Sequence, residues 1–248
     1  MTTKKTKFKD ECRIIREIYD NNEKNNIDEI FCCMSKELFS RVFEIEHKKT
    51  SRKFKFSLKE IEFYLFDVNK HEDHYVHCNK KQKGDENCGL FYVHSKGGNY
   101  GGIDISLAGE KYFFGVLIRG IEVENTNGIK YIAGPNRVKK YFILSLNVIK
   151  DSQDFKEHEI LQNILDNEVE IFVERADDPE EIYKGERIGL SFFEEKEDDY
   201  LYANYRFVAH DYLFGNKDDF EARSNLKKID KLKKNSCDIR EKNPCEEE

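Results

Sequence analysis

The stretch from Phe54 to Phe66 constrains the fold of this chain more than any other part of the sequence. It begins with strict alternation, in which Phe54, Phe56 and Leu58 are separated by polar residues, and then turns almost continuously apolar. Alternation is typical of a strand with one buried face, and a continuous apolar run is typical of a strand covered on both faces. The pattern therefore predicts a long strand that enters the interior of a sheet.

Further strands and helices are predicted around this strand. Strand-like runs occur at Leu90–His94, Ile103–Leu107, Tyr112–Val123, Val169–Glu174, Arg187–Phe193 and Tyr205–Val208. Apolar residues at helical spacing predict a docked helix within residues 27–46, a segment that can end in a strand. Further helices are predicted after Pro135 and over Glu157–Leu165. We expect one α+β domain over residues 27–215, with a polar and partly helical lead-in at 1–26 and a charged tail at 216–248.

Length and charge limit the classes of protein that fit. A chain of 248 residues can bury a sizeable core, and its net charge of -7 argues against a surface that attracts polyanions everywhere. No apolar run approaches the roughly 18 residues of a membrane span, and the start of the sequence lacks the pattern of a signal peptide. We therefore expect an intracellular protein, nuclear or cytoplasmic, with no membrane partner.

The residues with the most informative chemistry lie at the end of this stretch and directly after it. Glu60, Glu62 and Tyr64 close the strand, and the polar loop over residues 67–88 contains the segment His71-Glu72-Asp73-His74-Tyr75-Val76-His77-Cys78. Acidic, aromatic and imidazole groups together can hold a flat ring and activate a water molecule. Imidazole and thiolate groups are also the ligands that zinc prefers. The residue types alone leave both uses open.

The order of these and later motifs resembles the alkyladenine (3-methyladenine) DNA glycosylase family over roughly residues 28–210. The family's Glu-Thr-Glu-Ala-Tyr strand end is similar to residues 60–64, and its acidic stretch ending in histidine is similar to residues 72–77. Further matches follow in the same order at residues 90–94, 102–106, 115–122, 134–138, 187–190 and 205–207. The resemblance implies a single domain with a curved antiparallel β-sheet flanked by helices, and it implies no cofactor.

The resemblance also implies an activity. The family members are N-glycosidases that flip an alkylated base out of DNA during base excision repair. By this resemblance Glu62 activates a water and Arg119 orients it. The implied substrate contacts are Tyr64 and His77, which sandwich the base, His94 and Asp104, which line the pocket, and Arg137, which holds a backbone phosphate at a helix N-terminus. We expect a monomer whose substrate is a nucleic acid or a nucleotide.

Three positions depart from the family's pattern. The tyrosine that the family inserts into DNA falls near Lys96-Gly97, in a glycine-rich run without a large apolar side chain. His94 replaces a pocket tyrosine, and Asp104 replaces a pocket asparagine. An ionised Asp only accepts hydrogen bonds, whereas an Asn amide also donates them. We therefore expect a different base preference, and duplex DNA does not carry over as the substrate.

Two alternatives remain on the same residues. The chain can be a non-catalytic module that binds a nucleotide or a nucleic-acid end, which the acidic net charge and the missing wedge favour. It can also be a zinc-dependent hydrolase, although the spacing fits no compact zinc motif and we expect no metal. The ligand set for that alternative is His71, His74, His77, Cys78, Cys88 and His94. A purely structural ion pair is likewise an alternative role for Arg119 and its carboxylate partner.

Overall fold

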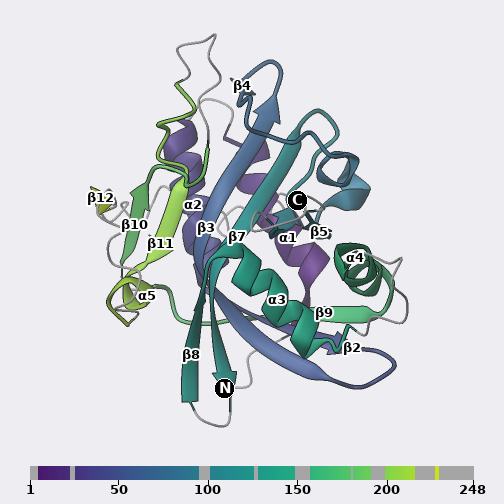
Figure 1. Cartoon of the computed structure of the whole chain (residues 1–248). Helices are drawn as coiled ribbons and strands as arrows, with labels where there is room; N and C mark the ends of the chain where they lie inside the picture. Colours follow the sequence, from purple (N-terminus) through teal and green to yellow (C-terminus); the bar gives the residue numbers. More distant parts are fainter. Residues whose placement is uncertain are drawn as a thin grey trace, which may run out of the picture.

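The strands in the described residues form one twelve-stranded antiparallel sheet that curls into half a barrel (Figure 1). The computed structural model describes residues 5–22, 26–94, 101–125, 128–148, 157–179, 181–190, 199–215 and 227–228. The strands are β1 (Thr6–Lys7), β2 (Arg41–His47), β3 (Lys53–Asp67), β4 (His71–Glu72), β5 (Phe91–Val93), β6 (Ile103–Ser106), β7 (Phe113–Asn125), β8 (Gly128–Ala133), β9 (Val169–Arg175), β10 (Ile182–Gly185), β11 (Arg206–Ala209) and β12 (Lys227–Lys228). The helices are α1 (Phe8–Asp20), α2 (Ile27–Phe39), α3 (Pro135–Ser145), α4 (Glu157–Asn167) and α5 (His210–Gly215), with 3-10 turns η1 (Lys80–Gln82) and η2 (Asp85–Asn87).

Strand β3 is the centre of the sheet and pairs with β2, β4, β7 and β11. The side chains of β3 that face the core change from even-numbered to odd-numbered positions at an irregularity in its pairing with β7. Leu58 pairs with Ile121, Glu60 with Gly120 and Ile61 with Ile118, and the register shifts on both sides of Glu60. Lys59 and Arg119 are therefore left without partners in the ladder. A β-bulge of this kind bends the strands and re-aims side chains. It explains why the core residues of β3 occupy even-numbered positions up to Leu58 and odd-numbered positions from Ile61 onward.

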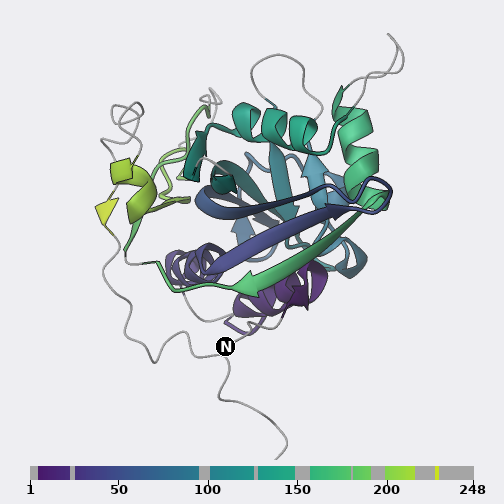
Figure 2. The ribbon, with the colours of Figure 1, turned by 90° about the horizontal axis from the view of Figure 1, so that it is seen from below.

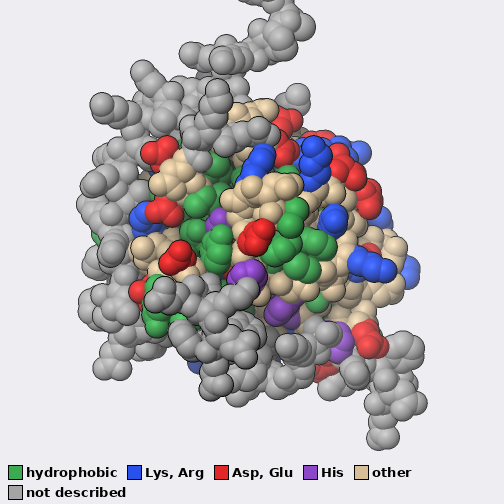
Figure 3. All heavy atoms as spheres, turned by 90° about the horizontal axis from the view of Figure 1, so that it is seen from above, with side chains coloured by type: hydrophobic (Ala, Val, Ile, Leu, Met, Phe, Trp, Pro, Cys, Tyr) green, Lys and Arg blue, Asp and Glu red, His purple; other side chains and the backbone are tan. Residues whose placement is uncertain are grey.

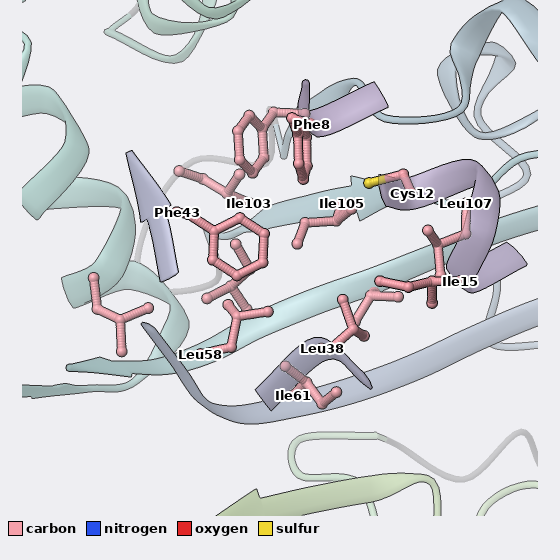
Figure 4. Close-up of a cluster of buried hydrophobic side chains, with 14 of the residues drawn as sticks. Phe8, Cys12, Ile15, Leu38, Phe43, Leu58, Ile61, Ile103, Ile105 and Leu107 are labelled. Carbon is pink, nitrogen blue, oxygen red and sulfur yellow. The ribbon is translucent and has the colours of Figure 1, made fainter. Parts of the chain in front are cut away.

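Before the bulge the even-numbered residues of β3 face the core, and after it the odd-numbered ones do. Leu58 and Ile61 are therefore both buried in one core although they lie three positions apart. Figure 4 shows them with side chains of α1 and β6, among which Phe8, Cys12 and Ile105 are labelled. The opposite face of β3 receives Glu60, Glu62 and Tyr64. We call this opposite face of β3, β6, β7 and β11 the outer face.

Helices lie on two sides of the curled sheet. In Figure 2 the strands pass between α1 and α2 on one side and α3 and α4 on the other. Aromatic contacts join the layers, because Phe91 of β5 lies 5.1 Å from Phe8 of α1 and 5.9 Å from Phe142 of α3, between ring centroids. The expected α+β class, with an antiparallel curved sheet and flanking helices, is confirmed at this level.

The described residues of the lead-in predicted at 1–26 pack into the domain, whereas we had predicted a polar extension outside it. Helix α1 lies within it and buries Phe8, Cys12, Ile15, Ile18 and Tyr19 in the same core as the sheet. These five residues recur near the helical period and therefore form one buried face of α1.

The helix expected within residues 27–46 is α2, and the strand β2 follows it as that pattern allowed. One element prediction needs correction. The strand expected at Arg187–Phe193 is irregular over residues 187–190, while 191–198 lie outside the described residues. Strands β8 and β10 were not predicted. Both lie toward margins of the sheet, and the first three residues of β8 are exposed, which removes the hydrophobic alternation that marks a strand.

Two predictions concern parts of the chain that are not described. The position of the missing wedge, Lys96-Gly97, falls outside the described residues, and so does the charged tail apart from Lys227 and Lys228. Within the described part, no helix combines the length and the apolar character required to cross a membrane.

The aromatic core supports a direct test of stability. Phe31 of α2 is fully buried and stacks on Phe63 of β3 at 4.5 Å between ring centroids. We expect Phe31→Ala to lower the free energy of unfolding by about 3–5 kcal/mol, because it removes a large buried side chain and leaves a cavity. Urea denaturation measures the change. The control is Leu144→Ala on α3, where the side chain is 74% exposed and the loss should stay within about 0.5 kcal/mol. Similar losses in both variants contradict the assignment of Phe31 to the core.

Candidate functional site

A row of side chains crosses the outer face from one strand to the next. In the register of the sheet, Glu62 of β3 is opposite Arg206 of β11 and Leu117 of β7, and Leu117 is opposite Asp104 of β6. Residues directly opposite each other on paired strands project to the same face. The structure therefore brings Glu62 and Asp104, which are 42 positions apart in the sequence (104 − 62), into one row with only Leu117 between them.

The Glu62 carboxylate is sealed within this row. Its exposed fraction is 0%, and three donors surround it. The Tyr64 hydroxyl donates to Oε2 at 2.9 Å, the Ile188 backbone N–H donates to Oε1 at 2.7 Å, and Arg119 Nη1 forms an ion pair with Oε1 at 3.3 Å. The structure thus brings Glu62, Tyr64 and Arg119 together as the sequence implied, but it places the carboxylate in the interior.

Glu60 completes the ion network beside it. Glu60 Oε1 accepts from Arg206 Nε at 2.8 Å and from Arg119 Nε at 3.1 Å. Burial alone would raise the pKa of Glu60, but the two guanidinium groups outweigh burial and lower this pKa below its ordinary value. Two carboxylates and two guanidinium groups balance, and the cluster of Glu60, Glu62, Arg119 and Arg206 is neutral. We call these four residues the ion network.

A second buried ion pair fastens the segment that contains Ile188. Arg187 donates from Nη1 to Asp73 Oδ2 at 2.5 Å and from Nη2 to Asp73 Oδ1 at 3.1 Å, and both side chains have no exposed surface. The guanidinium also lies over the rings of Tyr64, Tyr75 and Tyr205, at 4.6, 5.5 and 5.4 Å from their centroids. Sequence reasoning missed this pair. An arginine next to an apolar run requires a carboxylate, but spacing does not say which one.

The other end of the row is formed by Asp104 and its neighbours. Asp104 Oδ1 lies 2.8 Å from His94 Nε2, and Asp104 Oδ2 accepts from Gln82 Nε2 at 2.6 Å. His77, which is exposed, lies 5.2 Å from His94 between ring centroids. Three of the predicted site residues are therefore neighbours here. Gln82 was not predicted, because it lies in a polar loop where nothing distinguishes it from other glutamines.

The N-terminus of α3 reaches this part of the site. A Cβ built on Gly102 would lie 2.7 Å from Leu117 Cδ1, 3.4 Å from Pro135 Cβ and 3.7 Å from His94 Cδ2. Gly102 is therefore the point where the row, the imidazole and the start of α3 meet. Figure 3 shows histidine side chains close to apolar and acidic ones on the face that it displays.

The first turn of α3 is suited to an anion. Its N-cap, Gly134, has φ 92° and supplies no side-chain cap, Pro135 occupies the first turn, and this turn contains no acidic residue. Arg137 is exposed on the same turn, and Lys139 is half-buried against Gly101, where burial lowers the pKa of its ammonium group. Free backbone N–H groups and nearby cations favour a phosphate at such a position.

The histidines and cysteines proposed as zinc ligands do not come together. His71 is buried against Phe31, Tyr200 and Tyr205, and Cys88 is buried near Arg16 of α1. Of the four histidines in this set, all of which the structure describes, His77 and His94 are the one pair whose rings are in contact. Across the described ranges, no three His, Cys, Asp or Glu side chains are grouped as metal ligands.

The Arg187–Asp73 pair supports a prediction about stability. We expect Asp73→Asn to lower the free energy of unfolding by about 3–5 kcal/mol, because it leaves a buried guanidinium without its carboxylate. The matched control is Asp178→Asn, which removes one of two carboxylate partners of Arg175. Asp178 lies 3.0 Å from that guanidinium, its side chain is 73% exposed, and Glu37 remains as the other partner. Chemical denaturation should show a loss of no more than about 0.5 kcal/mol for that control. An equally small loss for Asp73→Asn contradicts a buried ion pair.

His71 makes the stability depend on pH. Burial lowers the pKa of His71 to about 4, from an ordinary value of 6.5, so the unfolded chain binds a proton at this site more readily than the folded one. Stability should therefore fall as pH decreases from 6.5 toward 4, by at most about 3 kcal/mol from this group. His71→Phe keeps a ring against Tyr200 and Tyr205 without the proton. Denaturation at a series of pH values should give a difference between the two proteins that is constant above about pH 7.5 and changes below 6.5. Parallel curves contradict the prediction.

The resemblance to the alkyladenine DNA glycosylases stays a prediction after comparison with known proteins. No protein-family model matches the chain, and no curated protein is significantly similar to it. The fold class and the antiparallel curved sheet are compatible with the resemblance but are coarser than membership of a family. The chemistry of the site therefore has to be judged from its own geometry.

Proposed function

We propose that the chain binds a nucleotide, or the end of a nucleic-acid strand, without cleaving it. The observation that supports this most strongly is the meeting of three features around Gly102: the anion-ready start of α3, the His94 imidazole and the polar row of the sheet. A nucleotide needs a site for a flat ring beside a site for a phosphate. The net charge of -7 makes general attraction to nucleic acid weak, so local contacts of this kind have to supply the binding.

The ring site consists of the predicted residues Tyr64, His77, His94 and Asp104. Tyr64 is half-buried and has the Arg187 guanidinium 4.6 Å from its ring centroid, so one face of the ring is already occupied by an internal group. His77 is exposed, and its position beside His94 offers an imidazole surface for stacking. A base held among these groups gains stacking on one side and a buried carboxylate at its edge.

The phosphate site consists of Arg137 and the first turn of α3, and Lys139 adds a second cation. A half-buried lysine with a lowered pKa has lost part of its hydration, and an approaching phosphate replaces that hydration. The distance from this turn to the ring site is short because Pro135 and His94 both border Gly102.

The position of Glu62 argues against a hydrolytic role in the described conformation. A general base has to contact the water that it activates. The carboxylate of Glu62 is fully buried, and its three donors include a backbone N–H of the segment fastened by Arg187. We therefore assign Glu62 to the support of the outer face.

An N-glycosidase remains a second candidate for a specific reason. Arg119 lies 3.3 Å from Glu62 and its side chain is 11% exposed, so a solvent path ends one residue from the carboxylate. This is the pair that the resemblance to alkyladenine glycosylases assigns to the water. The activity requires the segment at Ile188 to move away from Glu62, because its N–H occupies the oxygen nearest to Arg119.

The binding proposal predicts a phosphate-dependent affinity. Titration calorimetry should show that nucleoside 5′-monophosphates bind at least about tenfold more tightly than the same nucleosides. Arg137→Ala should weaken the affinity for the monophosphates about tenfold, since it deletes a charge-assisted contact worth about 1.5 kcal/mol. The affinity for the nucleosides should not change. Lys140→Ala is the control on the same helix, because Lys140 is exposed and is not part of the proposed site.

The same samples decide between binding and cleavage. Release of free base from alkylated, deaminated or unmodified nucleotides and oligonucleotides, abolished in Glu62→Gln, selects the glycosidase. Binding that survives Glu62→Gln without released base selects the binding module. If neither nucleosides, nucleotides nor oligonucleotides bind or react, both functions are wrong.

A further inference from the structure

Two free cysteines, Cys12 of α1 and Cys88 at the end of η2, are neighbours in the interior. Their exposed fractions are 1% and 0%. Burial raises the pKa of the Cys12 thiol well above its ordinary value, and the Cys88 thiol raises this pKa further. Two thiols influence each other in this way when they are close, because charge interactions weaken with distance. The fold therefore pairs two thiols that are 76 positions apart in the sequence (88 − 12).

A glycine holds the segment of Cys88 against the helix of Cys12. Gly89 has φ 76°, and a Cβ built on it would lie 2.7 Å from the backbone Cα of Lys9. A side chain does not fit there, because the nearest atom belongs to helix backbone that cannot turn aside. Lys9 and Cys12 are three residues apart on α1, and residues at this spacing are neighbours on the helix surface. Cys88, the residue before Gly89, therefore meets α1 close to Cys12.

The next turn of α1 supports the same placement. Burial raises the pKa of the Cys88 thiol to about 11, and the Arg16 guanidinium is the foremost of the charges that oppose this rise. Arg16 also donates from Nη1 to Asp85 Oδ1, at the start of η2, at 2.6 Å. Arg16 follows Cys12 by four positions and is its neighbour along the helix surface. Cys88 is thus close to both residues of α1.

We infer that Cys12 and Cys88 are the site of a reversible disulfide, which fastens η2 to α1 when the chain is oxidised. A disulfide requires Cα atoms about 4.4–6.8 Å apart, and the approach of the two main chains at Gly89 brings the cysteines together for such a bond. The inference goes beyond nucleotide binding and does not depend on it. The fastened segment also carries Gln82, whose amide donates to Asp104, so the redox state of the thiols acts on a part of the chain that touches the outer face.

A small disulfide such as oxidised glutathione is the oxidant. Cys88 reacts first, because Arg16 favours its thiolate. The Cys88 thiolate attacks one sulfur of glutathione disulfide and expels a glutathione thiolate, which takes up the proton that Cys88 lost. The Cys12 thiolate then attacks Cys88 Sγ, and the second glutathione leaves with the proton of Cys12. Two protein thiols are oxidised, one glutathione disulfide is reduced to two thiols, and excess thiol reverses both steps.

The segment of η2 can open to admit the oxidant. This three-residue 3-10 turn contains no buried residue. Its hydrogen bonds to α1, from Arg16 to Asp85 and from Lys9 Nζ to the Glu86 carbonyl at 3.4 Å, are both exposed. Segments with exposed hydrogen bonds and few buried contacts open locally at low cost. Opening exposes Cys88 while α1 stays in the core, and the rate of oxidation follows the frequency of opening.

Peptide mapping of the full chain without reduction tests the inference. After equilibration with oxidised glutathione, a cross-linked pair of peptides containing Cys12 and Cys88 should appear, and dithiothreitol should remove it. The oxidised chain should unfold at a temperature at least about 5 °C higher than the reduced chain, because the cross-link restricts the unfolded state.

Two variants separate the steps of the reaction. In Cys12→Ala the second step is blocked, so glutathione should stay on Cys88 as a mixed disulfide and the unfolding temperature should not rise on oxidation. The control is Cys78→Ala, which removes an exposed thiol and should form the cross-link as the unaltered chain does.

The cross-link is read on the unaltered chain, so it decides the matter even if Cys12→Ala fails to fold. No bond between Cys12 and Cys88, or one that forms only after the chain has been unfolded in urea, overturns the inference. A cross-link that lowers the unfolding temperature also overturns it, because the two main chains are then not spaced for a disulfide. Nucleotide binding is tested separately and stands or falls without this result.

Discussion

The change of phase between β3 and β7 determines where every polar group of the site can be. Side chains on a strand alternate, so a strand that buries Phe56 and Leu58 on one face would also direct Glu60 and Glu62 to that face. The bulge at Lys59 and Arg119 prevents this by turning both strands at the same point. The apolar residues stay in one core on both sides of the bend, and the acids emerge together on the outer face.

The charged side chains of the outer face can be buried under other parts of the chain because their charges cancel. A single buried carboxylate would be very costly, but Glu60 and Glu62 are matched by Arg119 and Arg206, and the Asp73–Arg187 pair adds no net charge. The segment at Ile188 is irregular and pairs with no strand, and it is held against the sheet by the hydrogen bond from its backbone N–H to Glu62 of the ion network. The groups that we propose for binding consequently lie further along the row, near Asp104 and α3. They are separate from Glu62, which the resemblance implied as the catalytic base.

Periodicity predicted those elements whose burial is regular. Enough positions are buried to give a recognisable hydrophobic pattern in the strands β3, β6, β7, β9 and β11 and in the helices α2, α3 and α4. Strand β8 was missed because Ile129 and its neighbours are exposed. The segment after Arg187 resembled a strand because of its apolar residues, but the backbone N–H of Ile188 is used by a side chain rather than by a neighbouring strand.

The site was predictable only in part for a related reason. Residue types and motif order indicated that Glu62, Tyr64 and Arg119 come together, and that His77, His94 and Asp104 are near one another. Contacts such as Asp73 with Arg187, or Gln82 with Asp104, join segments through side chains that leave no periodic trace in the sequence. Whether a carboxylate is open or sealed depends on such contacts, so the accessibility of Glu62 could not be foreseen.

The sharing of Glu60 between two guanidinium groups constrains how this chain can change over evolutionary time. Loss of Glu60 alone leaves Arg119 and Arg206 in excess of one carboxylate, and loss of either arginine alone leaves an acid in excess. Viable substitutions at these positions therefore have to arrive together, or in an order that passes through a compensated intermediate. Relatives that diverge freely elsewhere should carry these positions as a correlated block, in which the presence of one residue predicts the others.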